Sequence, residues 1–210
     1  VLLGDSANSV TSGAEGASIG GGGSSGLPNV VTDVFGVVGG GEGNTAGDSS
    51  GSVSDAGFSV VGGGKSNVAS GSYSGVVGGE SNTASGSHSF VGGGMGNLAS
   101  GSLSSVSGGG ENTASGSSSS VLGGSQNIAS GESSAVVGGR LNVANGTLSA
   151  VLGGDSNLAS GEVSVAAGSG AHALHNGAFV FSDLSLESSF SSRVDNEFAV
   201  RAAGGLRVVT

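Results

Sequence analysis

The chain has 210 residues, of which 47 are Gly, with a single Pro and no Cys. So much Gly excludes a helical protein, because Gly costs about 1 kcal/mol relative to Ala at each helical position. The scarcity of Pro and the absence of Cys exclude collagen and disulfide scaffolds. A net charge of −10 excludes electrostatic binding of nucleic acid or an anionic membrane.

The first 35 residues predict degenerate rungs of a repeat that becomes regular further along the chain. Residues 2–5 and 18–21 are partial copies of its apolar and Gly positions. Residues 22–33 contain the only proline, Pro28, and predict a protruding loop. The chain begins at Val1 without a signal peptide, which favours a segment of a longer protein.

Residues 36–181 carry a 15-residue repeat, S-x-V-x-G-G-x-x-N-x-A-S-G-x-x, with seven copies in phase. Asn44 belongs to an earlier copy and precedes Asn67 by 23 residues, so an insertion is expected near residues 48–56. The recurring apolar position holds Val61, Val76, Val91, Val106, Val121, Val136 and Val151. The recurring amide position holds Asn67, Asn82, Asn97, Asn112, Asn127, Asn142 and Asn157.

A unit this short predicts one rung of an all-β, parallel β-solenoid. Each 15-residue rung is expected to hold two strands of about five residues, S-x-V-x-G and N-x-A-S, joined by tight Gly turns. Side chains alternate between the faces of a strand. The recurring Ser, Val and first Gly are therefore expected on the inner face of one strand, and Asn and Ala on the inner face of the other.

The recurring Asn has two structural interpretations. It forms a ladder of amides from rung to rung, or it holds a left-handed turn after the Gly pair. A role as a ligand of another molecule is a third, less favoured interpretation.

The outward positions indicate self-association. One Val and one Ala per rung bury little area against the entropy of ordering a Gly-rich chain. Large apolar residues stand at positions expected to point outward. These are Val77, Phe90, Leu122, Val137 and Leu152. Partner chains are the expected cover, so a homo-oligomer is predicted.

Residues 182–210 differ in composition and predict a β-rich cap or neck that closes the exposed edge of the solenoid. Alternation of apolar and polar residues over 197–201 predicts one strand. Residues 206–209 predict another, after the Gly204-Gly205 turn.

The run Ser164-Val165-Ala166-Ala167-Gly168, followed by Ala171 and Ala173, resembles the repeat of YadA-like heads in trimeric autotransporter adhesins. The 15-residue unit is similar to that family's 14-residue repeat, with an extra Gly and with Asn in place of the first Ala. Similar arrays occur in phage-type tail fibres. The resemblance implies a left-handed parallel β-roll, a homotrimer, surface exposure and an adhesive role.

No residues are predicted to be catalytic, cofactor-binding or metal-ligating, and the chain is predicted not to be an enzyme. His88 occupies a freely varied turn position, which favours solvated surface. His172 and His175 are a weak metal pair, and a structural role is favoured. Thr83 and Thr113 alone do not form the regular Thr row of an ice-binding face.

The favoured function is adhesion to host cells, matrix or other surfaces by a homotrimeric fibre head. The alternatives are a phage or injection-system tail-fibre segment and a structural spacer of an extracellular filament. The expected partners are copies of the chain and an unidentified surface protein, matrix component or glycan, without nucleic acid or membrane insertion. The expected location is extracellular, on a cell surface through an outer-membrane anchor outside this chain, or on a virion fibre.

Overall fold

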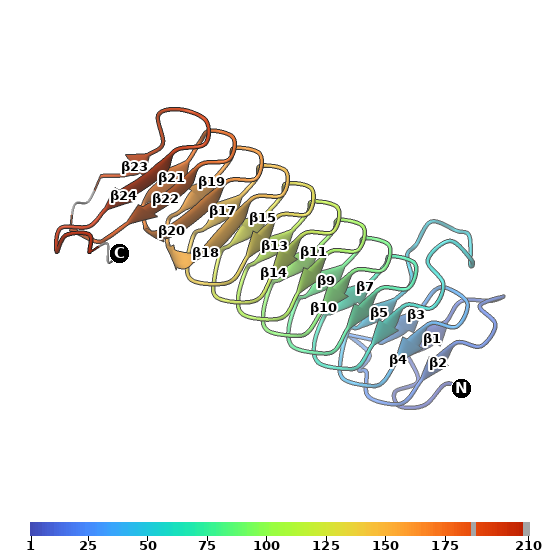
Figure 1. Ribbon diagram of the computed structural model, residues 1–210. Coiled ribbons are helices and arrows are strands. Elements are labelled where there is room, and N and C mark those ends of the chain that lie inside the picture. The colour runs from blue at the N-terminus through green and yellow to red at the C-terminus, as the bar shows by residue number, and fades with distance from the viewer. Residues whose placement is uncertain (186–187, 208–210) are drawn as a thin grey trace.

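The computed structural model describes residues 1–185 and 188–207, which form a rod of stacked β-coils (Figure 1). Each coil gives one strand to each of two sheets, and each sheet has twelve strands. Neighbouring strands in a sheet come from successive coils and run parallel. No helix occurs in the described residues. The prediction of an all-β, parallel β-solenoid is confirmed.

The odd-numbered strands form one sheet, here called the alanine sheet after its inward residue. They are β1 (Ser9–Val10), β3 (Val30–Val31), β5 (Thr45–Ala46), β7 (Val68–Ala69), β9 (Thr83–Ala84), β11 (Leu98–Ala99), β13 (Thr113–Ala114), β15 (Ile128–Ala129), β17 (Val143–Ala144), β19 (Leu158–Ala159), β21 (Ala171–Ala173) and β23 (Phe190–Ser191).

The even-numbered strands form the second sheet, here called the valine sheet. They are β2 (Ser18–Ile19), β4 (Val37–Val38), β6 (Val60–Val61), β8 (Gly75–Val76), β10 (Phe90–Val91), β12 (Ser105–Val106), β14 (Ser120–Val121), β16 (Ala135–Val136), β18 (Ala150–Asp155), β20 (Val165–Ser169), β22 (Phe179–Ser182) and β24 (Phe198–Arg201).

Most strands are only two residues long, so the prediction of five-residue strands is wrong. The reason lies in the corners of each coil. In one coil Tyr73, Gly79 and Ser81 all have positive φ, at 57°, 91° and 56°. A left-handed residue turns the chain away from the extended conformation that a strand requires. Most residues of each coil therefore lie in its corners and few lie in strands.

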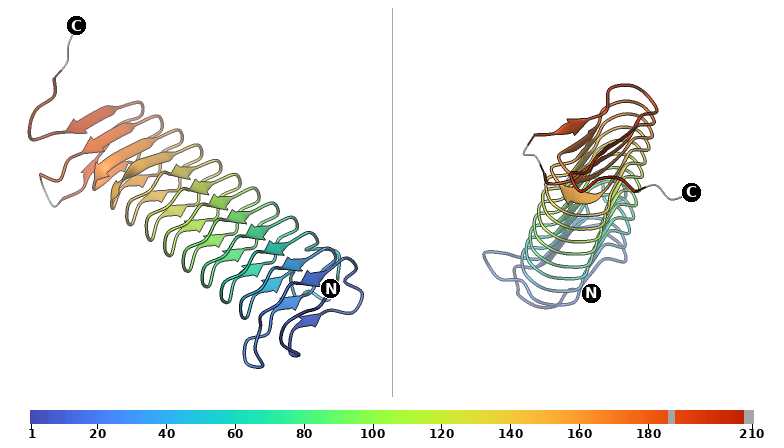
Figure 2. Two further views of the ribbon diagram at one scale, coloured as in Figure 1. Left: turned by 90° about the horizontal axis from the view of Figure 1, so that it is seen from below. Right: turned by 60° about the vertical axis from the view of Figure 1, so that its left-hand side comes forward.

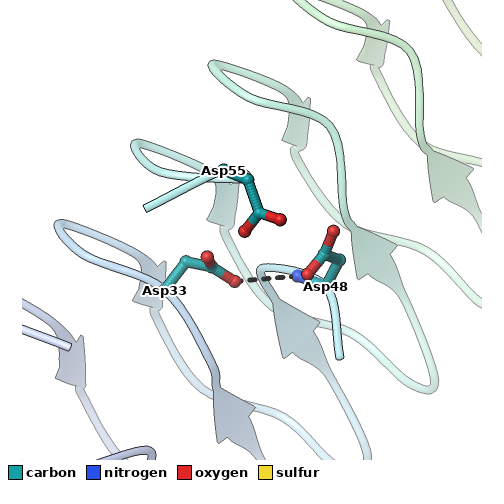
Figure 3. Close-up of side chains that lie close together, drawn as sticks. All are labelled: Asp33, Asp48 and Asp55. Carbon is teal, nitrogen blue, oxygen red and sulfur yellow. Dashed lines mark hydrogen bonds between the residues drawn. The ribbon is translucent and has the colours of Figure 1, made fainter. Parts of the chain in front are cut away.

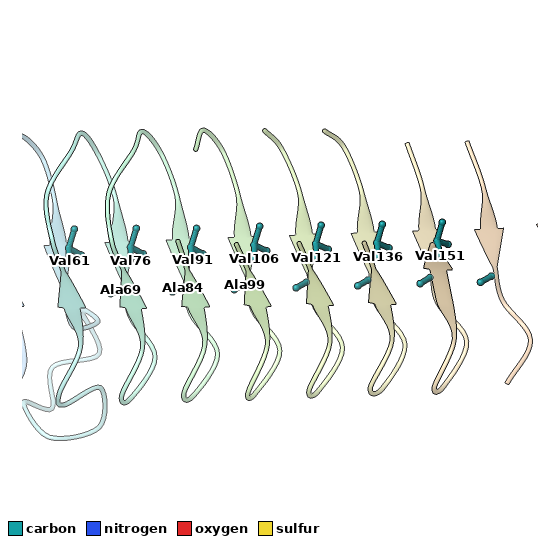
Figure 4. Close-up of a cluster of buried hydrophobic side chains, with 14 of the residues drawn as sticks. Val61, Ala69, Val76, Ala84, Val91, Ala99, Val106, Val121, Val136 and Val151 are labelled. Atoms are coloured by element: carbon teal, nitrogen blue, oxygen red, sulfur yellow. The ribbon is translucent and has the colours of Figure 1, made fainter. Parts of the chain in front are cut away.

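The register places like residues on top of one another. Val91 pairs with Val76 and Val106, and Ala99 pairs with Ala84 and Ala114. The valine column faces the alanine column across the narrow interior (Figure 4). All the valines of the column are at most 1% exposed. Each contributes about 1.5–3 kcal/mol by burial.

The N-terminal residues join the same two sheets. Leu2 bridges to Ile19, and β1 pairs with β3. Because β3 lies within residues 22–33, the predicted protruding loop is too long. Only a short turn closed by Ser24 and Leu27 stands outside the ladder. The insertion near 48–56 has no strand and protrudes beside the N-terminal coils (Figure 1, cyan), while β4 pairs with β6 across it.

The segment predicted as a cap extends the rod instead of closing it. Strand β23 pairs with β21, and β24 pairs with β22 in a four-residue register. The predicted strand at 197–201 corresponds to β24. Residues 206 and 207 are irregular, and the rest of the last predicted strand lies outside the described residues. Viewed more nearly along the rod, the coils lie over one another from end to end (Figure 2).

The Gly pair works differently from the prediction, which placed its first member inside. In the coil of Val106, Gly108 has open space where a Cβ would lie. Gly109 has φ +90°, and a Cβ there would overlap the carbonyl oxygen of Gly124 and lie 2.7 Å from Asn112 Nδ2. The second Gly is the constrained one, because the next coil passes against it.

We therefore expect Gly109→Ala to lower the melting temperature strongly and Gly108→Ala to leave it unchanged or raise it slightly. An Ala at a compatible position stabilises by about 0.4–1 kcal/mol through the unfolded state, whereas one at positive φ against backbone destabilises by more. Thermal unfolding followed by circular dichroism checks the pair. Equal losses in both variants would contradict this turn geometry.

Candidate functional site

The two recurring columns lie inside the rod. The seven recurring valines and the seven recurring asparagines are all at most 1% exposed. This is the interior placement that the alternation of side chains predicts. Their contacts are with the chain itself, so any surface that recognises another molecule must be built from other positions.

The asparagines form an amide ladder, the first of the two structural interpretations. Asn112 Nδ2 donates to the carbonyl oxygens of Gly108 and Gly124, both at 3.0 Å. Its Oδ1 accepts the backbone N–H of Asn127 at 3.0 Å. The left-handed interpretation is wrong by one residue, because Glu111, just before the amide, has φ 56°. The ladder closes each turn and ties it to the next coil.

The ladder reaches further than the repeat pattern indicates. Asn8 Oδ1 accepts the N–H of Asn29 at 2.8 Å, and Asn29 Oδ1 accepts the N–H of Asn44 at 3.0 Å. At the other end, Asn157 Oδ1 accepts the N–H of Ala171. Asn8 and Asn29 were not predicted from the sequence, because the repeat around them is degenerate. Asn29 precedes Asn44 by the regular 15 residues, but Asn8 precedes Asn29 by 21. The signal for Asn29 is this 15-residue spacing together with the Gly-rich stretch before it.

A second buried polar column has no hydrogen-bond partner. It is the recurring Ser that precedes each valine-sheet strand, where the hydroxyl oxygens are buried and unpaired. The column comprises Ser59, Ser74, Ser89, Ser104, Ser119, Ser134, Ser149 and Ser164. The inward placement of these serines agrees with the prediction. A buried hydroxyl without a partner destabilises the fold, so hydrogen bonding does not explain why Ser recurs here. The small size of Ser, which the close packing of the interior requires, explains it.

The outer face of the valine sheet is apolar and open to solvent. Its exposed large side chains include Val60, Val77, Phe90, Leu122, Val137, Leu152 and Phe181. Near its N-terminal end, a depression of about 260 Å³ is lined by Val60, Gly62, Gly75, Val76, Val77 and Phe90. It forms where Gly75 has no side chain between its neighbours in the column. Apolar side chains gathered on one face mark an interaction site. Ser105 and Ser107 interrupt them in one coil.

One corner of the coil carries a stack of aromatic rings that sequence analysis did not find. Phe35, Phe58, Tyr73 and His88 stack in order, with ring centroids 4.8, 4.9 and 4.9 Å apart. We call these four residues the aromatic ladder. Phe58, Tyr73 and His88 follow one another at the regular 15 residues. The insertion hid Phe35, which is one coil from Phe58 in space but 23 residues away in sequence. His88 is exposed, as predicted, and its ring stacks on Tyr73.

The other two histidines lie near the C-terminal end. His175 Nδ1 is 2.8 Å from Ser192 Oγ, which links two coils. His172 points outward from β21, and burial lowers the pKa of its imidazole. The metal-ligating group found in the described residues contains neither of them.

Three carboxylates meet at the insertion, another feature that sequence analysis missed (Figure 3). Asp33, Asp48 and Asp55 each place an oxygen within 4.8 Å of the others, a spacing that could hold a cation. Asp33 is fully buried, and its Oδ2 accepts the N–H of Asp48 at 2.9 Å and the hydroxyl of Thr32. A hydrogen bond from Ser50 lowers the pKa of Asp55. The hydrogen bond between Asp33 and the backbone of Asp48 fastens the insertion to the rod.

The described residues contain no helix with the length and apolarity needed to cross a membrane. No protein-family model matches the chain, and no curated protein is significantly similar to it. A functional argument therefore rests on the fold and on the chemistry of the surface.

Proposed function

We propose that this chain is the head segment of a homotrimeric, non-enzymatic surface fibre that mediates adhesion. The observation that carries the proposal is the open face of the valine sheet, on which exposed apolar side chains recur from Val60 to Phe181. The sequence resembles YadA-like heads, whose coil is left-handed, and the proposal includes a left-handed coil for this chain. A long rod with a repeated surface suits multivalent attachment, where linked sites gain a factor of about 10²–10⁴ in avidity.

Self-association is expected because a single chain leaves large apolar side chains of the valine sheet without cover. Val77 is 58% exposed and Leu122 is 53% exposed, although almost all the buried apolar residues of the protein are only Val and Ala. Burying such a side chain contributes about 1.5–3 kcal/mol. In a parallel, in-register trimer each coil meets the same coil of its neighbours, so one repeat rule serves all three chains.

Light scattering of the purified chain tests the trimer, with a mass three times that of one chain as the expected result. The variant Leu122→Ser/Val137→Ser is expected to shift the mass toward the monomer. Ser107 already occupies the matching position of another coil, so Ser is compatible with the fold. A stable, folded monomer of the unaltered chain at micromolar concentration would refute the trimer. Beads coated with the trimer and failing to attach to cells or matrix would refute adhesion.

A further inference from the structure

The corner that carries the aromatic ladder is left-handed in nine successive coils, with φ between 55° and 62°. Its residues are Phe35, Phe58, Tyr73, His88, Leu103, Ser118, Ser133, Leu148 and Val163. A left-handed conformation costs a non-Gly residue roughly 1–2 kcal/mol, and bulky residues are rare there. Ser118 and Ser133 demonstrate that a small polar side chain meets the needs of the turn. The fold therefore does not require four rings in succession.

Burial does not explain the rings either. Phe35 is 48% exposed, Phe58 45% and Tyr73 54%. The rings are nearly parallel, with interplanar angles of 14°, 2° and 15°. Stacking offsets part of the backbone strain, at about 0.5–1.5 kcal/mol per pair. The result is a set of large apolar groups held rigidly at the surface in fixed steps.

The geometry determines what these rings present to a partner. Each ring covers the face of the next, and Leu103 follows His88 in the column. At the other end Gly16 lies so close that a Cβ there would be 2.7 Å from Phe35 Cε1. The ring faces are therefore closed, and the C–H edges remain open. Ring edges carry partial positive charge, and their complement is the electron-rich face of another aromatic system.

Charge narrows the class of partner. Lys65 is the single Lys or Arg in residues 1–139, which include the whole ladder, and the chain has a net charge of −10. Polyanions are thus repelled from this region. A compact cation would need an open ring face, which the stack does not offer. Ser72 directly precedes Tyr73 in the chain, and its hydroxyl can meet polar substituents of the ligand.

We propose that the aromatic ladder is a binding site for extended, flat aromatic molecules, which lie across the ring edges of several coils at once. The site belongs to a single chain and does not depend on the trimer. Its length along the rod, three steps of 4.8–4.9 Å, favours a conjugated or polyphenolic ligand over a single small ring.

Curcumin, a flat, conjugated and uncharged polyphenol, is the probe, with fluorescence titration as the measurement. The unaltered protein is expected to bind it saturably, and Phe58→Ser/Tyr73→Ser to weaken binding at least tenfold. Leu148→Ser changes the same corner outside the ladder and is the matched control, expected to leave binding unchanged. Both variants install the residue that Ser118 and Ser133 already supply, and circular dichroism verifies their folding.

Two further measurements separate this site from other dye-binding surfaces. Tyr73→Phe is expected to retain full binding, because it keeps the ring edge. High salt is expected to leave the affinity of the ladder largely intact, because the binding joins ring edges to an uncharged ligand and salt screens only interactions between charges. No saturable binding to the unaltered protein, equal loss in the ladder variant and the control, or a lowered melting temperature of the ladder variant with unchanged binding would each overturn the proposal.

Discussion

Val106→Asp is expected to abolish folding of the central coils. Val106 is fully buried between Val91 and Val121, and it faces the alanine column across an interior one side chain thick. An ionised carboxylate there has no cation within reach, because the buried positions of the central coils, residues 89–131, hold only Val, Ala, Ser, Asn and Gly. An uncompensated buried charge destabilises by several kcal/mol, which is a large part of the stability of a whole domain.

Glu111→Ser is the matched control for this substitution. Glu111 is exposed on the turn of the same coil, and Ser66, Ser81 and Ser156 occupy its place in other coils. Circular dichroism is expected to report a cooperative melt near that of the unaltered protein for Glu111→Ser, and a lost or greatly lowered melt for Val106→Asp. Equal melting temperatures for the two would overturn the division into inward and outward positions.

The interior was predictable because each coil repeats the same choices. Val, Asn and Ser return at fixed spacing, and the alternation of a strand assigns them to one side. What sequence could not decide was the conformation of single residues. The repeat identifies two Gly in each turn, but only the passage of Gly124 beside Gly109 determines which of them must lack a side chain. In the same way, the left-handed residue is Glu111, not the recurring Asn112.

The surface was less predictable, because its features combine residues from coils of unequal length. Asn67 follows Asn44 by 23 positions because the insertion lies between them, so the spacing of Phe35 and Phe58 conceals that their rings stack. Asp33 and Asp48 are 15 residues apart, a signal in the sequence, but Asp55 joins them only through the path of the insertion. Features that composition and the repeat period do not predict are therefore found mainly where the repeat is interrupted.

The same interruption explains how the rod tolerates irregular segments. In a solenoid each coil contacts only its neighbours, so stability is approximately a sum of local terms. The backbone ladder passes the insertion unbroken, from Val37 to Val60 and from Thr45 to Val68. The amide ladder does so as well, from Asn44 to Asn67 at 3.0 Å. A loop of any shape can leave the coil at this corner if the inward residues on both sides stay in register.

The amide ladder is expected to be as important as the valine column, and Asn112→Ala tests it. The substitution leaves the carbonyl of Gly108 and the N–H of Asn127 without the partners that the amide provides. Each buried group left unpaired costs about 1–3 kcal/mol, so the expected loss is about 2–6 kcal/mol. Ser115→Ala, an exposed change in the same coil, is the control and is expected to leave the melting temperature unchanged.

Asn112→Asp separates hydrogen bonding from packing, because the two side chains have nearly the same shape. The carboxylate keeps the acceptor for Asn127 but cannot donate to Gly108 or Gly124, and its charge is buried. Burial raises the pKa of such a carboxyl in the folded state above its unfolded value. The folded protein then binds more protons, so the stability of this variant should increase as the pH falls through that raised pKa. The unaltered protein has no titrating group at this position, so the difference in melting temperature between the two should shrink on acidification. A difference that is small and independent of pH would mean that the column of asparagines fills space and that its hydrogen bonds contribute little.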